Sequence, residues 1–278
     1  MNTVKILAKK WYDIIDFPSE YDVKFEELLS EETDVVPMKF DEYDVASNRS
    51  NKGKNLVMFL YFCEELSQKY EEKGIPREIL LDTIDDFKIS VKRQYDIDGR
   101  IGIVMASVLA KHLSMKLFRL GRLQFCMEPF AIDLPEKGLS KGSPVLDIHI
   151  PVGNSITKDA LNHSFKLADE FFGKYFPDYH YDYYMCHSWL LDETLKKFLK
   201  EGSNILEFQN LFHPVLKKED DAILRFMFKY HIDSREELHD CSATTTFAKY
   251  VKEYALSEGK FYNVLGVCKK SEIIKEKN

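Results

Sequence analysis

One stretch, residues 145–192, constrains the fold more than any other, because it reads as strand, turn, helix, loop and strand. It begins with the run Val145-Leu-Asp-Ile-His-Ile150. The two-residue period of a strand places Asp147 and His149 on one face of this run and its aliphatic residues on the other. The stretch therefore opens with a predicted strand that has one polar and one apolar face.

The turn and helix that follow this strand predict a site for an anion. Gly153 and Asn154 can take a left-handed conformation, and Thr157 is the predicted N-cap of a helix that ends at Gly173. Residues 181–191 then return as an aromatic-rich strand. Unpaired N–H groups and the helix dipole both point at the helix N-terminus, so negative charge is favoured there.

The N-terminal part of the chain, residues 1–115, is predicted to be helical and carries no catalytic signature. Its apolar residues recur at the spacing of amphipathic helices. Polar, aperiodic residues 33–54 are predicted to form a long connection. The predicted helices cover residues 4–15, 56–70, 76–91 and 100–112.

From residue 116 onwards strands alternate with helices, which predicts an α+β fold with an α/β-type mixed sheet. The predicted domains are therefore residues 1–115 and residues 116–278. The segment 203–212 fits either a short helix or a strand. The other predicted elements are a hairpin-like pair within 116–134, a loop at 137–144, a helix over 192–199, a strand over 222–228, a helix between 242 and 259 and an edge strand over 261–268.

Composition excludes several classes of protein. With 45% hydrophobic and 31% charged residues, the chain is typical of a soluble globular protein. Its apolar runs are too short to span a bilayer and its N-terminus lacks a signal-peptide pattern, so we expect a cytoplasmic location and no membrane partner. A net charge of −7 without a basic cluster argues against nucleic acid as a partner. The oligomeric state is not specified.

Neither the cysteines nor the histidines predict a metal site. The five cysteines are scattered and form no C-x-x-C pair, so reduced thiols are expected rather than disulfides or zinc. His213, His231 and His239 show no metal-ligand spacing with partners.

Three phrases resemble a known family. They are Leu120-Gly-Arg-Leu-Gln-Phe125, His149-Ile-Pro151 with its following Gly153, and Cys186-His-Ser-Trp-Leu-Leu-Asp192 followed by Ser203-Asn-Ile205. Together they resemble a bacterial family of N-acyltransferases with a helical N-terminal domain and a C-terminal domain like the GNAT acetyltransferase fold. The resemblance covers essentially the whole chain and implies that fold, without established catalytic residues to carry over.

The resemblance also implies a co-substrate, acetyl-coenzyme A or another acyl-coenzyme A. In GNAT enzymes a strand runs into a phosphate-cradling loop and a helix whose N-terminus receives the pyrophosphate. The matching positions here are Val152, Gly153, Asn154, Ser155 and Ile156. The familiar loop has a Gln or Arg followed by closely spaced glycines. This chain has one glycine there, which argues against tight coenzyme binding.

N-acyl transfer needs a base for the amine, donors for an oxyanion and an acid for the departing thiolate. His149, at the mouth of the turn, is the candidate base, or it merely hydrogen-bonds the turn backbone. Asp147 on the same face either orients this imidazole or is an ordinary solvated carboxylate. Tyr184 is the candidate acid, as tyrosine is in many GNAT enzymes, with Tyr183 as an alternative.

Other polar residues are weaker candidates. Cys186 could form a covalent intermediate with His149 as its base, although a lone buried cysteine usually behaves as a small hydrophobe. Arg122 and Gln124 share a strand face and are predicted, with Ser188, to line the substrate cleft, or else they pair with acidic neighbours. Glu128 and Glu207 are reserve candidates for the base.

Two functions follow from these features. The first is an acyl-coenzyme A-dependent N-acyltransferase that transfers an acyl group, acetyl as the first choice, to a small amine. The second is a non-catalytic GNAT-like binding module that has lost coenzyme affinity. The missing glycines favour the binding module, whereas the strand–turn–helix unit with His149 favours the enzyme.

Overall fold

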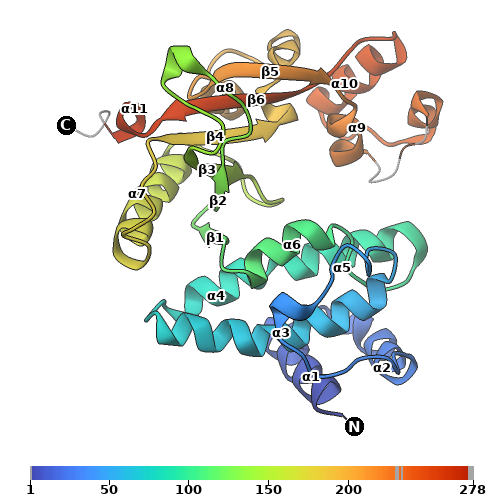
Figure 1. Ribbon diagram of the computed structural model, residues 1–278. Coiled ribbons are helices and arrows are strands. Elements are labelled where there is room, and N and C mark those ends of the chain that lie inside the picture. The colour runs from blue at the N-terminus through green and yellow to red at the C-terminus, as the bar shows by residue number, and fades with distance from the viewer. Residues whose placement is uncertain (1, 229–231, 233, 275–278) are drawn as a thin grey trace. The chain divides into compact units, whose positions relative to one another are not determined.

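A computed structural model describes residues 2–228, 232 and 234–274, so His231 lies outside the described residues. The chain divides into two compact units (Figure 1). The first comprises residues 1–120 and 173–175, and the second comprises residues 121–172 and 176–278.

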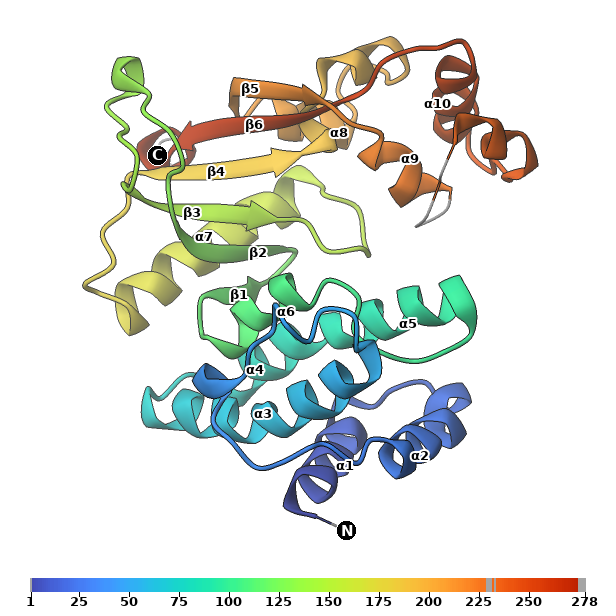
Figure 2. The same cartoon turned by 45° about the vertical axis from the view of Figure 1, so that its right-hand side comes forward.

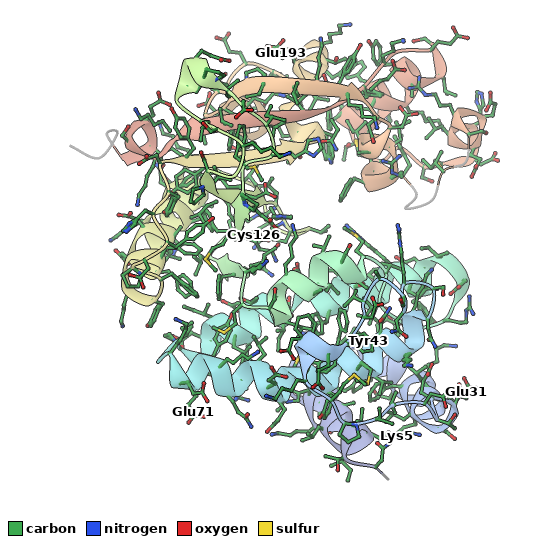
Figure 3. All side chains as sticks on the ribbon, viewed as in Figure 1. Lys5, Glu31, Tyr43, Glu71, Cys126 and Glu193 are labelled. Atoms are coloured by element: carbon green, nitrogen blue, oxygen red, sulfur yellow. The ribbon has the colours of Figure 1, made fainter. Side chains whose placement is uncertain are left out.

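The first unit is built mainly of helices around a buried central one. Residues 56–60 of α3 are all buried, so this helix is covered on several sides and forms the core of the unit. Within this core the Tyr43 hydroxyl donates to Oδ1 of Asn55 over 2.8 Å (Figure 3). The helices are α1 (Thr3–Ile15), α2 (Asp22–Glu31), α3 (Lys52–Glu72), α4 (Arg77–Ile84), α5 (Asp86–Asp98) and α6 (Ala106–Leu113), with the 3-10 turns η1 (Ser19–Tyr21) and η2 (Phe40–Glu42).

The helical character of this unit is confirmed, but two predicted helices have other bounds. The predicted helix over 76–91 is divided between α4 and α5, and Asp86 in the first turn of α5 suits a helix N-terminus. The predicted helix over 100–112 begins only at Ala106, because Gly99 ends α5 in a left-handed conformation and Met105 precedes α6 in another.

A six-stranded mixed sheet has the strand order β1-β2-β3-β4-β6-β5. Strands β3 and β4 are parallel, whereas β2–β3, β4–β6 and β5–β6 are antiparallel (Figure 2). This arrangement confirms the α+β fold class. The strands are β1 (Leu117–Leu120), β2 (Leu123–Pro129), β3 (Pro144–His149), β4 (Tyr183–Ser188), β5 (His213–Glu219) and β6 (Tyr262–Lys269).

Helix α7 (Lys158–Tyr175) covers one face of this sheet and connects β3 to β4. Thr157 caps it as predicted, since its side chain accepts from the N–H of Ala160, but the helix continues past Gly173 to Tyr175. Its Phe165 packs edge-on against Phe125 of β2, with ring centroids 5.9 Å apart. Because side chains alternate along a strand, the odd-numbered residues of β3 lie on the sheet face opposite α7.

The pairing between β3 and β4 is short. It consists of Leu146 opposite Tyr184 and Asp147 opposite Met185. Beyond these pairs each strand stays paired with its other neighbour, as far as His149 in β3 and Ser188 in β4. The carboxyl-terminal main-chain groups of β3 and β4 are therefore not matched to each other in the ladder.

An insertion between β5 and β6 forms a hydrophobic cluster together with Leu195, which precedes β5. Arg235 ties it together, because its guanidinium donates to both carboxylate oxygens of Asp221, over 2.7 and 3.0 Å, and to the carbonyl of Gly259 over 2.6 Å. The cluster consists of Leu195, Ile223, Leu224, Leu238, Val251, Ala255 and Phe261. The remaining elements are α8 (Asn204–Gln209), α9 (Ala222–Met227), α10 (Thr246–Leu256), α11 (Lys270–Ile274), η3 (Pro135–Lys137), η4 (Trp189–Leu191), η5 (Glu193–Lys197) and η6 (Arg235–Asp240).

Four predictions for this part of the chain were wrong or incomplete. The predicted strand over 222–228 is helix α9, and the predicted helix over 192–199 is the shorter 3-10 helix η5. The ambiguous segment 203–212 holds the short helix α8. The predicted edge strand over 261–268 is β6, which lies between β4 and β5. The edge position belongs to β5, whose exposed lysines and single proline are typical of an edge strand.

Candidate active site

Asp147 and His149 lie side by side on the sheet face opposite α7. Nε2 of His149 is 3.1 Å from Oδ2 of Asp147, with 28% and 13% of the two side chains exposed. The two groups are within ion-pair distance but are not aligned as a hydrogen bond. The carboxylate lies beside Nε2, which is itself buried, so a base acting on an incoming amine would have to use the other ring nitrogen, Nδ1.

Strand β2 supplies the neighbours of this pair. Gln124 stands opposite His149 and Cys126 opposite Asp147 in the antiparallel ladder, so their side chains share the same face. Both are buried, and Sγ of Cys126 lies 3.5 Å from Oε1 of Glu128. The imidazole of His149 therefore lies beside Gln124, Cys126 and Asp147 on one face of β2 and β3.

The loop between β3 and α7 is open to solvent. Residues 152–155 are exposed, whereas Pro151 and Ile156 on either side of them are buried. Gly153 has φ +148°, and among the described residues beyond its two chain neighbours no atom lies within 4 Å of where a Cβ would stand. This side of Gly153 is therefore open, so an anion can approach its main chain between β3 and the N-terminus of α7.

Arg122 fastens this loop to the start of β2. Its Nε donates to the carbonyl of Asn154 over 2.5 Å, and its Nη1 donates to the carbonyl of Pro151 over 2.8 Å. Its main-chain N–H donates to Oγ of Ser164 in α7 over 2.8 Å. The guanidinium thus holds the loop in shape and places a positive charge beside it.

The predicted site residues on β4 do not lie on the sheet face that carries His149. Tyr184 packs between Phe165 and Tyr181, and Cys186 is fully buried on the same side of β4. Burial raises the pKa of both side chains, with further increases from Tyr181 for Tyr184 and from Asp147 for Cys186. Ser188 accepts the N–H of Leu190 and so caps η4. The structure does not bring Tyr184 or Cys186 to the face of His149.

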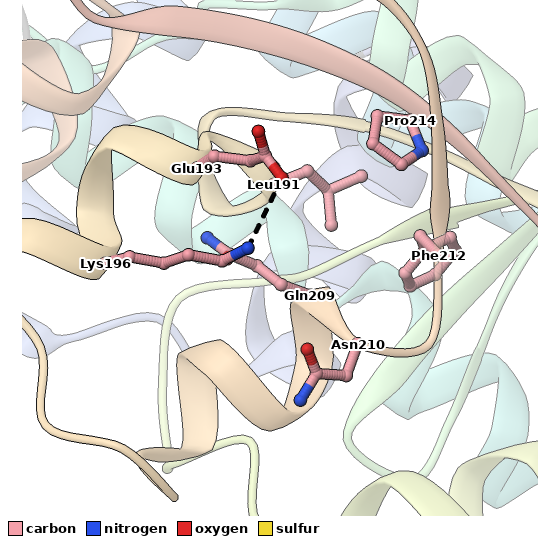
Figure 4. A pocket seen from close by; sticks show the side chains of 7 residues that line it. All are labelled: Leu191, Glu193, Lys196, Gln209, Asn210, Phe212 and Pro214. Atoms are coloured by element: carbon pink, nitrogen blue, oxygen red, sulfur yellow. Dashed lines mark hydrogen bonds and ion pairs between the residues drawn. The ribbon is translucent and has the colours of Figure 1, made fainter.

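A pocket of about 190 Å³ lies where the chain leaves η4 and where α8 enters β5 (Figure 4). Nζ of Lys196 lies 3.3 Å from Oε1 of Glu193 at this pocket. Gln209 donates from Nε2 to the carbonyls of Leu190 and Asp192, over 2.9 Å each, and so fixes the segment after β4. The lining residues are Leu191, Glu193, Lys196, Gln209, Asn210, Phe212 and Pro214, none of which was predicted from the sequence as a site residue.

The sequence gives no sign that Gln209 is buried and holds the main chain. Its partners are main-chain carbonyls, and the segment that contains α8 fitted a strand as well as a helix. Of the reserve bases, Glu128 lies on β2 and Glu207 on α8.

Within the described residues, no three His, Cys, Asp or Glu side chains form a group that could hold a metal ion. The helices of this same part of the chain include none with the length and apolarity needed to cross a membrane.

Solved structures with the same fold are acyltransferases. One, in complex with decanoyl-CoA and teicoplanin, is 20% identical with a TM-score of 0.75, covering 94% of this chain and 87% of that chain. Another, in complex with decanoyl-CoA, is 23% identical with a TM-score of 0.72, covering 94% and 86%. A mutant acyltransferase in complex with octanoyl-CoA is 20% identical with a TM-score of 0.75, covering 94% and 87%. At these identities the likeness shows the fold.

Family models cover nearly the whole chain, whereas no curated protein matches it. The model of an N-acyltransferase N-terminal domain matches residues 5–115, and the model of a GNAT-like C-terminal domain matches residues 117–268. The resemblance of the three sequence phrases to N-acyltransferases is thereby confirmed. The chain belongs to the N-acyltransferase family whose members join this N-terminal domain to a GNAT-like C-terminal domain.

Proposed function

We propose that this protein transfers an acyl group from acyl-coenzyme A to an amine. The observation that carries the proposal is the exposed loop between β3 and α7, with open space at Gly153 and the guanidinium of Arg122 beside it. Phosphate groups are stabilised by such a loop because main-chain donors, the helix dipole and a positive charge act together. The family and the acyl-coenzyme A complexes of the structural neighbours support the same co-substrate.

In this proposal His149 takes the proton of the amine. Its imidazole lies at the end of β3, next to the loop, and Asp147 orients it. Tyr184 and Cys186 have raised pKa values in the core, so we assign them to packing rather than to chemistry. The octanoyl and decanoyl groups of the neighbours' co-substrates favour a medium-length acyl group over the acetyl group that the sequence suggested.

Melting temperature tests the proposed co-substrate. Octanoyl-CoA at about 100 times its Kd stabilises the folded chain by about 2.7 kcal/mol, which corresponds to a rise of roughly 5 °C for a protein of this size. ATP at the same concentration is the control for non-specific phosphate binding. Release of free thiol on adding a panel of amines then separates transfer from binding alone. No rise in melting temperature supports the binding module that has lost coenzyme affinity. A rise without thiol release for any amine shows that the coenzyme binds and contradicts the proposed transfer.

Replacing Arg122 by alanine is expected to raise the Kd for octanoyl-CoA about tenfold, since hydrogen bonds from a charged group contribute about 1.5–3 kcal/mol. Without the guanidinium, the carbonyls of Pro151 and Asn154 lose their donors and the loop loses its positive charge. Lys260→Ala is the control, because it removes one exposed positive charge that pairs with Glu219. Calorimetric titration measures both variants, and equal Kd values for Arg122→Ala and the unaltered protein would remove Arg122 from the site.

A further inference from the structure

The segments that follow β3, β4 and β5 all lie along one edge of the sheet, the edge formed by strand ends and not by an outermost strand. Strand β4 is parallel to β3, and β5 is parallel to both because each of β4 and β5 is antiparallel to β6. Their carboxyl ends therefore lie along the same edge (Figure 2). The segments that follow are the loop after His149, η4 beginning at Trp189, and α9 beginning at Ala222.

Large apolar side chains meet at this edge. The ring of Trp189 lies 6.2 Å from the ring of Phe226 in α9, with 38° between their planes. Phe226 is 52% exposed, and Trp189 is partly exposed. We call these two residues the aromatic pair.

The positions of both rings are fixed by their surroundings. The main chain on either side of Trp189 is held by the cap from Ser188 and by the bonds of Gln209 to Leu190 and Asp192. In α9, the residues Ala222, Ile223 and Leu224 are buried, and the last two belong to the cluster of the insertion. Phe226 extends from this anchored helix, and its own side chain stays 52% exposed.

The position of the aromatic pair relative to His149 determines which part of an acyl-coenzyme A can reach the two rings. The reacting thioester must come within reach of the imidazole at the carboxyl end of β3. An acyl chain continues beyond the thioester carbonyl, away from the loop that receives the phosphates. The next strand is β4, and the residue that follows it is Trp189.

We infer that the aromatic pair Trp189–Phe226 contacts the acyl chain and gives the enzyme its preference for chains of octanoyl or decanoyl size. This inference rests on the proposed function, because it assumes an acyl-coenzyme A co-substrate. A flexible alkyl chain suits this surface, since two partly exposed aromatic rings offer it apolar area to bury. An acetyl group is too short to cover two rings.

Affinities for a series of acetyl-, butyryl-, octanoyl- and decanoyl-CoA test the inference. The unaltered protein is expected to bind octanoyl-CoA more tightly than acetyl-CoA, with a gain of up to about fourfold for each methylene that becomes buried. In Trp189→Ala and Phe226→Ala, the gain from acetyl to octanoyl is expected to fall about tenfold, the usual effect of removing a large aromatic contact. The Kd for acetyl-CoA should stay within twofold, which also shows that the variants fold.

Tyr250→Ala is the matched control, because Tyr250 is an aromatic residue of the same insertion, on α10 and 48% exposed. It should leave the chain-length series unchanged. If no acyl-CoA of any length binds the unaltered protein, the proposed function itself fails. If acyl-CoAs bind but the aromatic-pair variants keep the full gain with chain length, this inference is overturned and the proposed function stands. An effect on the KM for the amine alone would assign the pair to the acceptor and overturn it equally.

Discussion

His149→Ala is expected to lower the turnover of acyl-coenzyme A and amine by a factor of about 10² to 10⁴, the usual contribution of a positioned acid or base. The Kd for octanoyl-CoA should not change, because His149 lies on β3 before the loop that receives the phosphates. The reason is geometric: the imidazole is partly exposed and held 3.1 Å from Asp147, whereas Tyr184 and Cys186 are buried on the side of α7.

Two further variants separate chemistry from structure. His213→Ala is the matched control, since His213 lies on the edge strand β5 with 55% of its side chain exposed. It should retain full turnover. Asp147→Asn removes the charge that faces the imidazole while keeping the side-chain volume, so a smaller loss of turnover is expected than for His149→Ala. Thiol release at saturating acyl-coenzyme A is the measurement. Unchanged turnover in His149→Ala would move the base to another residue, of which Glu128 on the same sheet face is the first to examine.

The arrangement around His149 was accessible from the sequence because it depends on local periods. Alternation along β3 placed Asp147 and His149 together, and the cap at Thr157 marked the start of α7. Both signals arise within a few residues of the chain, where backbone geometry dictates side-chain direction. The division into a helical part and a mixed part followed from periodicity in the same way.

Features that depend on distant partners were not accessible. The guanidinium of Arg122 binds carbonyls 29 and 32 residues away, and carbonyls carry no residue identity that a sequence could reveal. The sequence of α9 is short and mostly apolar, and such a run fits a helix and a strand equally well. Only its packing on the hydrophobic cluster of the insertion shows that it is a helix. Strand β5 is largely exposed and lacks the apolar alternation of a half-buried strand. The place of β6 depends on pairing with both β4 and β5.

Asp192→Ala is expected to lower the free energy of unfolding by about 2 kcal/mol, because it leaves two partly buried main-chain donors without acceptors. Asp192 is 3% exposed, and its carboxylate accepts the N–H groups of Thr194 and Tyr262, each over 2.9 Å. The first bond starts η5 and the second joins it to the beginning of β6. Urea denaturation followed by circular dichroism measures the change.

Asp240→Ala is the control, since Asp240 is exposed on η6 and its replacement should change the free energy by no more than about 0.5 kcal/mol. Asp192→Asn should fall between the two, because an amide has one acceptor oxygen and its NH₂ group faces one of the two donors. Equal stability of Asp192→Ala and Asp240→Ala would contradict the role given to the carboxylate. The main-chain carbonyl of Asp192 still accepts from Gln209 in Asp192→Ala, so the segment that begins with Trp189 keeps this bond. We therefore expect the loss of stability to leave the dependence of affinity on acyl chain length largely unchanged.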